Sequence, residues 1–221
     1  MNKFPNAAKG ISNIFTAQIL SLIAILATGI ASILAAVMIG GARVGSSVAA
    51  GASGIGMMIF GTGAGILAII ALIIDIVGVV QAAKDEESFK LIIKLTIFSL
   101  IVAVIGSIIS AIFRDRVIMA SIVNAVTDII SLICSILIIV GIGNIAIKLK
   151  NNDVAERCNS LLKVILWIGI LAIACRFFAL FMPSTLAAAI VILLLVASMV
   201  LYFVEYILFI SLLAKAKKML Q

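Results

Sequence analysis

Long runs of apolar residues dominate the chain, and short polar or charged segments separate them. Six of these runs exceed about 20 residues, the length that an α-helix needs to cross roughly 30 Å of hydrocarbon. We expect spans at approximately residues 14–39, 55–83, 91–113, 117–147, 161–182 and 185–213. Continuous runs favour helices over a membrane β-barrel, because barrel strands alternate apolar and polar positions in short segments.

Five of the six runs also carry small or polar residues at alternating steps of three and four, which return to one face of a helix. In the first two runs these stripes are Ala17, Ser21, Ala24, Thr28, Ala31 and Ala35, and Ala64, Ala68, Ala71, Asp75, Gly78 and Ala82. Small residues let membrane helices approach one another closely. We therefore predict an all-α fold, a single polytopic bundle of six transmembrane helices over residues 1–221, with short loops.

Composition supports an integral membrane protein, because 65% of the 221 residues are hydrophobic and only 11% are charged. A soluble domain has about a quarter of its residues charged. If the N-terminus is cytoplasmic, twelve of the sixteen Lys and Arg residues lie on the cytoplasmic side. The positive-inside rule then predicts an N-in/C-in protein of the cytoplasmic membrane.

The net charge of +7 is therefore interpreted as a topology signal. No soluble segment is long enough to form a basic nucleic-acid-binding face, so we expect no nucleic-acid partner. The basic inner rim should favour anionic lipid headgroups. The partners that we expect are membrane lipids, with a homo-oligomer or other membrane subunits as a further prediction.

A glycine-rich stretch, residues 40–65, is predicted to be the longest connection in the chain. It is either a re-entrant loop or hinge lining a cavity, or a flexible outer loop leading into a closely packed helix start, which we favour. Its Gly61-Thr62-Gly63-Ala64-Gly65 segment is no dinucleotide fingerprint, because no strand precedes it, and the P-loop lysine is missing. We expect no cofactor.

Two weak internal similarities leave a repeat open. Residues 18–23 resemble residues 128–133, which would fit an inverted repeat of three helices, as in many secondary transporters. Residues 75–94 also align without gaps with residues 144–163, which would instead fit duplication of a helical hairpin.

Two charged residues, Asp128 and Arg176, lie in neighbouring runs, each about 5–6 Å outward of its middle at 1.5 Å per residue. An ion pair between them is therefore reasonable, because an unpaired charge at that depth costs at least about 3 kcal/mol. The pair is either a gate or binding site, or a structural link between two helices. Asn124 shares the polar face of Asp128, which fits a wet cavity lining or helix packing through hydrogen bonds.

Two further carboxylates, Asp75 and Glu205, lie about 8 Å inward of the middle of their runs. Asp75 is in register with Ala71 and Gly78, so we expect it to face the bundle. It is our first candidate for a carboxylate that binds a proton or cation. The competing interpretation is a carboxyl group that hydrogen-bonds a neighbouring helix near the cytoplasmic interface.

Enzyme classes are poorly supported, because the chain has no histidine and therefore no His-based triad or HExxH zinc site. We expect no catalytic residues and no metal site. The leading prediction is that the protein moves, or helps to move, a small solute or ion across the membrane. The alternatives are a non-transporting scaffold that binds proteins or lipids, and a substrate-binding membrane subunit of a modular transporter. A solvated cavity reaching Asp75 or Asp128 would favour transport.

Overall fold

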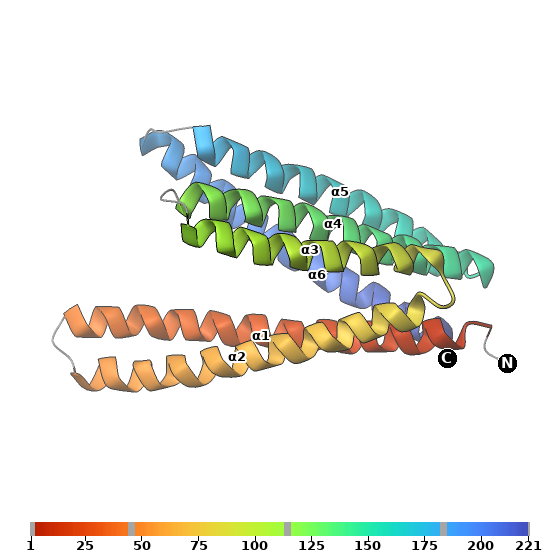
Figure 1. The fold of residues 1–221 in the computed structure, drawn as a ribbon, viewed down its shortest axis with the longest axis horizontal. Helices are drawn as coiled ribbons and strands as arrows, with labels where there is room; N and C mark the ends of the chain where they lie inside the picture. The colour runs from red at the N-terminus through yellow and green to blue at the C-terminus, as the bar shows by residue number, and fades with distance from the viewer. Residues whose placement is uncertain (1–2, 44–46, 113–115, 182–184, 221) are drawn as a thin grey trace.

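The computed structural model describes residues 3–43, 47–112, 116–181 and 185–220, and gives no side-chain detail at 36, 39–55, 57, 103, 107, 109–122, 124, 128, 172–199 and 202. The described residues form helices and no strand (Figure 1). In chain order the helices are α1 (Pro5–Arg43), α2 (Ser47–Ala82), α3 (Glu87–Ile112), α4 (Arg116–Lys148), α5 (Asn152–Phe181) and α6 (Thr185–Leu220).

Four helices in the described part of the chain are long and apolar enough to cross a membrane. They cover Pro5–Ala35, Met58–Ala82, Glu87–Gly106 and Ala125–Lys148. Large apolar side chains on their surfaces are exposed, including Ile33 at 66% and Ile69 at 61%. Extended apolar surface of this kind marks contact with lipid or with other proteins. The helices therefore indicate a membrane protein.

The prediction of a long glycine-rich loop at residues 40–65 is wrong. Helix α1 continues to Arg43 and α2 begins at Ser47, so nearly the whole stretch has helical backbone. Glycine usually interrupts soluble helices. In a membrane, however, the backbone must satisfy its hydrogen bonds within the helix, and glycine is frequent in such helices.

Consecutive helices pair as antiparallel hairpins, α1 with α2, α3 with α4, and α5 with α6 (Figure 1). Both termini and the α2–α3 and α4–α5 connections lie at one end of the molecule, which we call the terminal end. At the opposite or far end, the α1–α2 hairpin diverges from the other four helices. The molecule is thus a wedge that is closed at its terminal end.

The predicted small-residue faces of α1 and α2 are buried against each other. Ala17, Ala24 and Ala31 of α1 are at most 7% exposed, and so are Ala64 and Ala71 of α2. The backbones are closest at Gly10 and Gly78, where a Cβ atom built on Gly10 would lie 2.5 Å from the Gly78 carbonyl oxygen. The α1–α2 hairpin is therefore joined by direct backbone contact.

The apolar core lies towards the terminal end of the wedge. Its fully buried members include Ile11 and Ile14 of α1, Phe89 of α3, Ile142 of α4 and Leu213 of α6. Side chains from several hairpins thus meet in this region. The core holds the hairpins together there, while the helix backbones diverge farther out (Figure 1).

Candidate functional site

A cavity of about 720 Å³ lies along the α1–α2 hairpin. Its polar side chains on α1 are Gln18, Ser21 and Thr28. The side contributed by α2 is mostly small, with Gly61, Ala64, Gly65, Ala68 and Ala71 before Asp75. These α2 residues recur at helical spacing, so one face of α2 supplies its side of the cavity.

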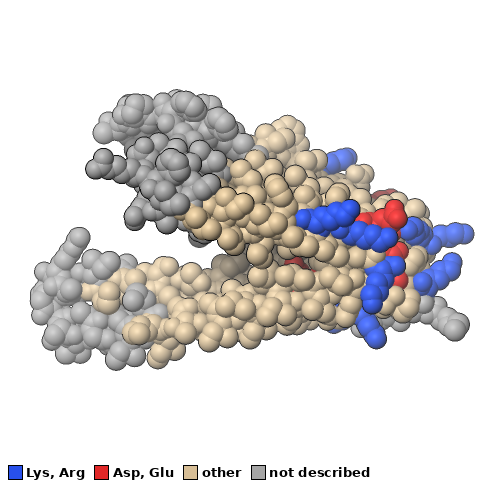
Figure 2. Space-filling model, viewed as in Figure 1, with Lys and Arg blue, Asp and Glu red and all other residues tan. Residues whose placement is uncertain are grey.

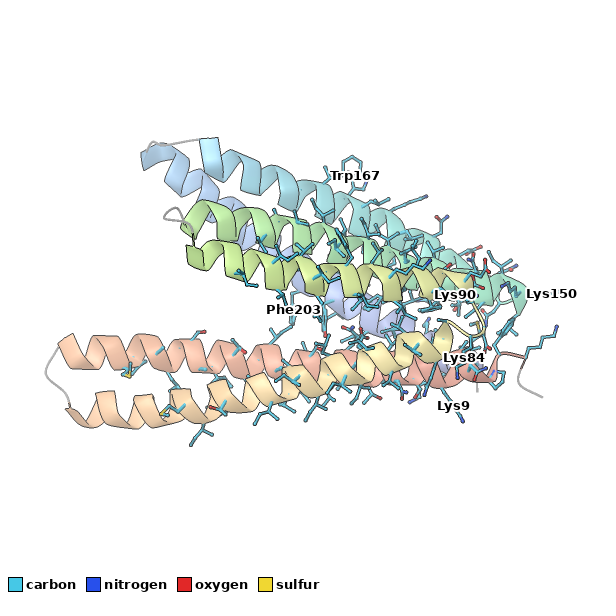
Figure 3. The ribbon with its side chains drawn as sticks, viewed as in Figure 1. Lys9, Lys84, Lys90, Lys150, Trp167 and Phe203 are labelled. Carbon is cyan, nitrogen blue, oxygen red and sulfur yellow. The ribbon has the colours of Figure 1, made fainter. Side chains whose placement is uncertain are left out.

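The cavity is on the side of the α1–α2 hairpin that faces the other helices. The hydroxyl of Tyr206 in α6 donates to the carbonyl oxygen of the cavity residue Gln18 at 2.6 Å. Figure 2 shows a hollow between the hairpin and the remaining helices, with acidic atoms at its inner end. In Figure 3, Phe203 of α6 extends into the space between α6 and the hairpin. The cavity therefore opens into the wedge.

Asp75 is the charged residue of the cavity lining. Its Oδ1 atom is buried and has no hydrogen-bond partner among the described residues, while the side chain of Gln18 approaches the carboxylate. Buried polar atoms normally have a partner, because leaving one unsatisfied costs about 1–3 kcal/mol. This oxygen is thus an available acceptor beside a large cavity.

Asp75 also borders a second space of about 220 Å³ between α2 and α3. The lining of that space is apolar apart from Asp75 and Thr96 of α3, and includes Ile76, Val79, Ile93 and Leu100. The carboxylate therefore lies where two cavities meet. A bound group at Asp75 has room for substituents on both sides of α2.

Polar contacts between this site and the terminal end join α1 to α6 and to the end of α2. In addition to the Tyr206 contact, the Asn13 side-chain amide of α1 donates to Gln81 Oε1 of α2 at 3.0 Å. Asp85, just after α2, accepts from the Ala7 backbone N–H at 2.7 Å and from Asn6 Nδ2 at 2.9 Å. Asp85 thereby caps the N-terminus of α1, where free N–H groups and the helix dipole favour an anion.

The neighbouring Glu86 binds the opposite side of the wedge. It is 7% exposed, and its Oε2 accepts from Lys148 Nζ of α4 at 2.6 Å. Its Oε1 accepts from Asn144 Nδ2 at 3.1 Å and from Ser88 Oγ at 3.4 Å. Burial alone would raise the pKa of Glu86, but these hydrogen bonds and the Lys148 charge outweigh it and hold the pKa below its usual value.

Of the other predicted site residues, the structure describes the side chain of Glu205 alone, and it lies outside the cavity. Glu205 has a buried Oε2 without a partner among the described side chains, but it does not line either cavity around Asp75. The side chains of Asn124, Asp128 and Arg176 lie outside the described part of the structure. The proposed Asp128–Arg176 ion pair and the polar lining at Asn124 therefore stay predictions.

Sequence reasoning missed the roles of Asp85, Glu86, Asn144 and Lys148. Asp85 and Glu86 lie in a short charged connection, which is usually solvated. The available signal was the unbroken acidic run at residues 85–87, directly before a predicted helix.

The described residues hold no group of three or more His, Cys, Asp or Glu side chains suited to a metal ion. No protein-family model, curated protein or solved structure matches the chain. The functional argument therefore depends on the cavity and its carboxylate.

Proposed function

We propose that the protein moves, or helps to move, a small solute or ion across the cytoplasmic membrane, with Asp75 at its binding site. The observation that carries this proposal is the cavity of about 720 Å³ that ends at a buried carboxylate oxygen without a partner among the described residues. A tightly packed scaffold has no need of such a cavity. Intramembrane carboxylates that face a cavity commonly mark ion or substrate pathways.

The same proposal includes six membrane spans with both termini cytoplasmic. Besides the four apolar helices already described, α5 has 30 residues and α6 has 36, which exceeds the length needed to cross a bilayer. The described Lys and Arg side chains gather at the terminal end, including Lys9, Lys84, Lys90 and Lys150 (Figures 2 and 3). The positive-inside rule then assigns the terminal end to the cytoplasm.

The wedge corresponds to an outward-open state in this assignment. Asp85 and Glu86 link the cytoplasmic ends of α1 and α4 to the same short connection, while the backbone of the α1–α2 hairpin diverges from the other helices at the far end. Alternating access requires a second state in which this end opens and the far end closes. The α1–α2 hairpin is the rigid body that would rock, because its two helices contact each other along their buried alanine faces.

A thermal-shift screen of the purified protein across ions and small metabolites tests the proposal. We expect at least one solute to raise the melting temperature in a saturable way, since a ligand that binds only the folded state stabilises it. Asp75→Asn should abolish that shift, whereas Glu87→Gln should retain it, because the Glu87 side chain is 93% exposed outside the cavity. No response, together with a stoichiometric membrane partner, would contradict transport by this chain.

A second candidate function, a membrane scaffold, is favoured by one specific observation. Cβ atoms built on Gly61 and Gly65, one turn apart on the same face of α2, would meet nothing within 4 Å. Such a small-residue face is the kind of surface that another membrane helix packs against. Crosslinking between copies, or to a partner, through Gly65→Cys would support this alternative, and a monomer without crosslinks would count against it.

A further inference from the structure

The chemical character of the cavity around Asp75 restricts what it can bind. Apart from Asp75, its described polar side chains are Gln18, Ser21 and Thr28, and the other described lining residues are small or apolar. Pockets of about 300–1,000 Å³ with mostly apolar walls and a few polar groups typically hold small organic molecules. The volume of about 720 Å³ falls within that range.

The charge of the cavity lining indicates which charge the ligand carries. The chain as a whole carries +7, yet among the described residues the lining of both cavities contains one carboxylate and no Lys or Arg. A buried carboxylate is strongly disfavoured without a counter-charge or hydrogen-bond donors. Its unpartnered Oδ1 adds a vacant acceptor at the same point. The complementary group is therefore a cation that can donate a hydrogen bond.

A small inorganic cation fits this site less well. Hard cations such as Ca²⁺ take six to eight oxygen ligands, and Mg²⁺ requires an octahedral set. The described residues around Asp75 supply few oxygens, and the second cavity is lined chiefly by Ile and Leu side chains. Apolar space on both sides of the carboxylate instead suits a hydrocarbon body attached to the cationic group.

We propose that the cavity binds a lipophilic organic ammonium ion, whose N–H donates to Asp75 while its hydrocarbon body occupies the apolar space beside α2. This inference rests on the proposed transport function, and it names organic ammonium ions as the class of substrate that the protein moves.

Calorimetric titration of the full-length protein in lipid nanodiscs tests the proposal with three probes of nearly equal size and shape. They are 1-adamantylammonium, the neutral 1-adamantanol and the anionic adamantane-1-carboxylate. We expect saturable binding of one ammonium ion per chain, at least tenfold weaker binding of the alcohol, and no binding of the carboxylate. Equal affinity for all three probes, or no saturable ammonium binding, would overturn the proposal.

Two variants test separately how the carboxylate and the space around it contribute to ammonium binding. Asp75→Asn should weaken ammonium binding at least tenfold, and its matched control Glu87→Gln removes an exposed carboxylate outside the cavity and should leave binding unchanged. Ala68→Leu keeps the carboxylate but narrows the cavity, and exposed Ala68 has room for the larger side chain. It should also weaken binding, even if Asp75→Asn folds poorly. Unchanged affinity in Ala68→Leu would contradict binding in this cavity.

The outcomes also distinguish this inference from the proposed function. An Asp75-dependent thermal shift with a neutral or anionic solute, without ammonium binding, would retain transport and overturn the ammonium class. Saturable, Asp75-dependent ammonium binding without uptake into proteoliposomes would support the cation site and contradict transport of that ion by this chain.

Discussion

Lys148 Nζ lies 2.6 Å from Glu86 Oε2, which joins the end of α4 to the short connection between α2 and α3. The same connection caps α1 through Asp85. This connection of four residues thus ties the α1–α2 hairpin to the α3–α4 hairpin at the terminal end. We regard this cluster as the closure that allows the far end of the wedge to open without separating the helices.

Lys148→Met should lower the stability of the folded protein, because it leaves the nearly buried Glu86 carboxylate without its cationic partner. An unsatisfied buried group of this kind costs about 1–3 kcal/mol, and the melting temperature in detergent should fall by several degrees. Lys90→Met is the control, since Lys90 and Glu87 are both exposed and lie 3.8 Å apart. Equal decreases in melting temperature in the two variants would show that the Glu86–Lys148 pair stabilises the fold no more than the exposed Glu87–Lys90 pair does.

The Glu86 contacts also predict a pH dependence. The pKa of Glu86 is held below its usual value, so the folded protein releases this proton more readily than the unfolded chain. Its contribution to stability is therefore complete above the unfolded carboxyl pKa of about 4.3. It is lost as the pH falls through the lower folded pKa. The difference in melting temperature between wild type and Glu86→Gln should shrink from about pH 6 to about pH 3, and a constant difference would contradict this role.

Glycine positions in α2 should differ sharply in their tolerance of a side chain. A Cβ atom on Gly78 would lie 2.8 Å from the Gly10 carbonyl oxygen, whereas one on Gly65 would meet nothing within 4 Å. Gly78→Val should therefore separate α1 from α2 and reduce the yield of folded protein. Gly65→Ala should be neutral or stabilising by up to about 1 kcal/mol, since alanine favours the helix. Yield and melting temperature after purification check both outcomes.

Asp85→Ala should loosen the first turn of α1, because it removes the acceptor for Asn6 and for the Ala7 N–H. Loss of a helix cap costs about 1 kcal/mol. Hydrogen exchange of the amides at residues 6–9 should accelerate about five- to tenfold, with little change near Phe89, which stays in the core. Acceleration spread evenly over all helices would instead indicate global destabilisation.

Much of the helical architecture could be predicted from the sequence. The small-residue stripes of α1 and α2 identified buried positions such as Ala24 and Ala71, because helix periodicity places them on one face. The stripes could not show how much of each small-residue face is covered by another helix and how much lines a cavity. Ala64 is buried and Ala68, one turn later, is exposed, although both line the cavity. That difference depends on the angle between hairpins, which no local pattern specifies.

Only part of the candidate site could be predicted from the sequence, because the rest depends on how distant helices pack together. Asp75 could be selected because a carboxylate deep in an apolar run is costly and usually has a role. Its cavity depends on contacts with α3 and α6 that are distant in sequence, such as Tyr206 with Gln18, 188 residues apart. The Asp85–Glu86 closure likewise requires α1 and α4 to converge on one short connection.

The central claim, that water reaches Asp75 through the cavity along the α1–α2 hairpin, is tested most directly by thiol labelling. Ala68→Cys is placed in a chain whose three native cysteines are replaced by alanine, and oriented membrane vesicles are treated with membrane-impermeant methanethiosulfonates. We expect reaction from the outer face, faster with the trimethylammonium reagent than with the sulfonate reagent. Asp75→Asn should reduce that preference, and Ile69→Cys on the lipid side should stay unreactive. No reaction at position 68 from either face would contradict the account.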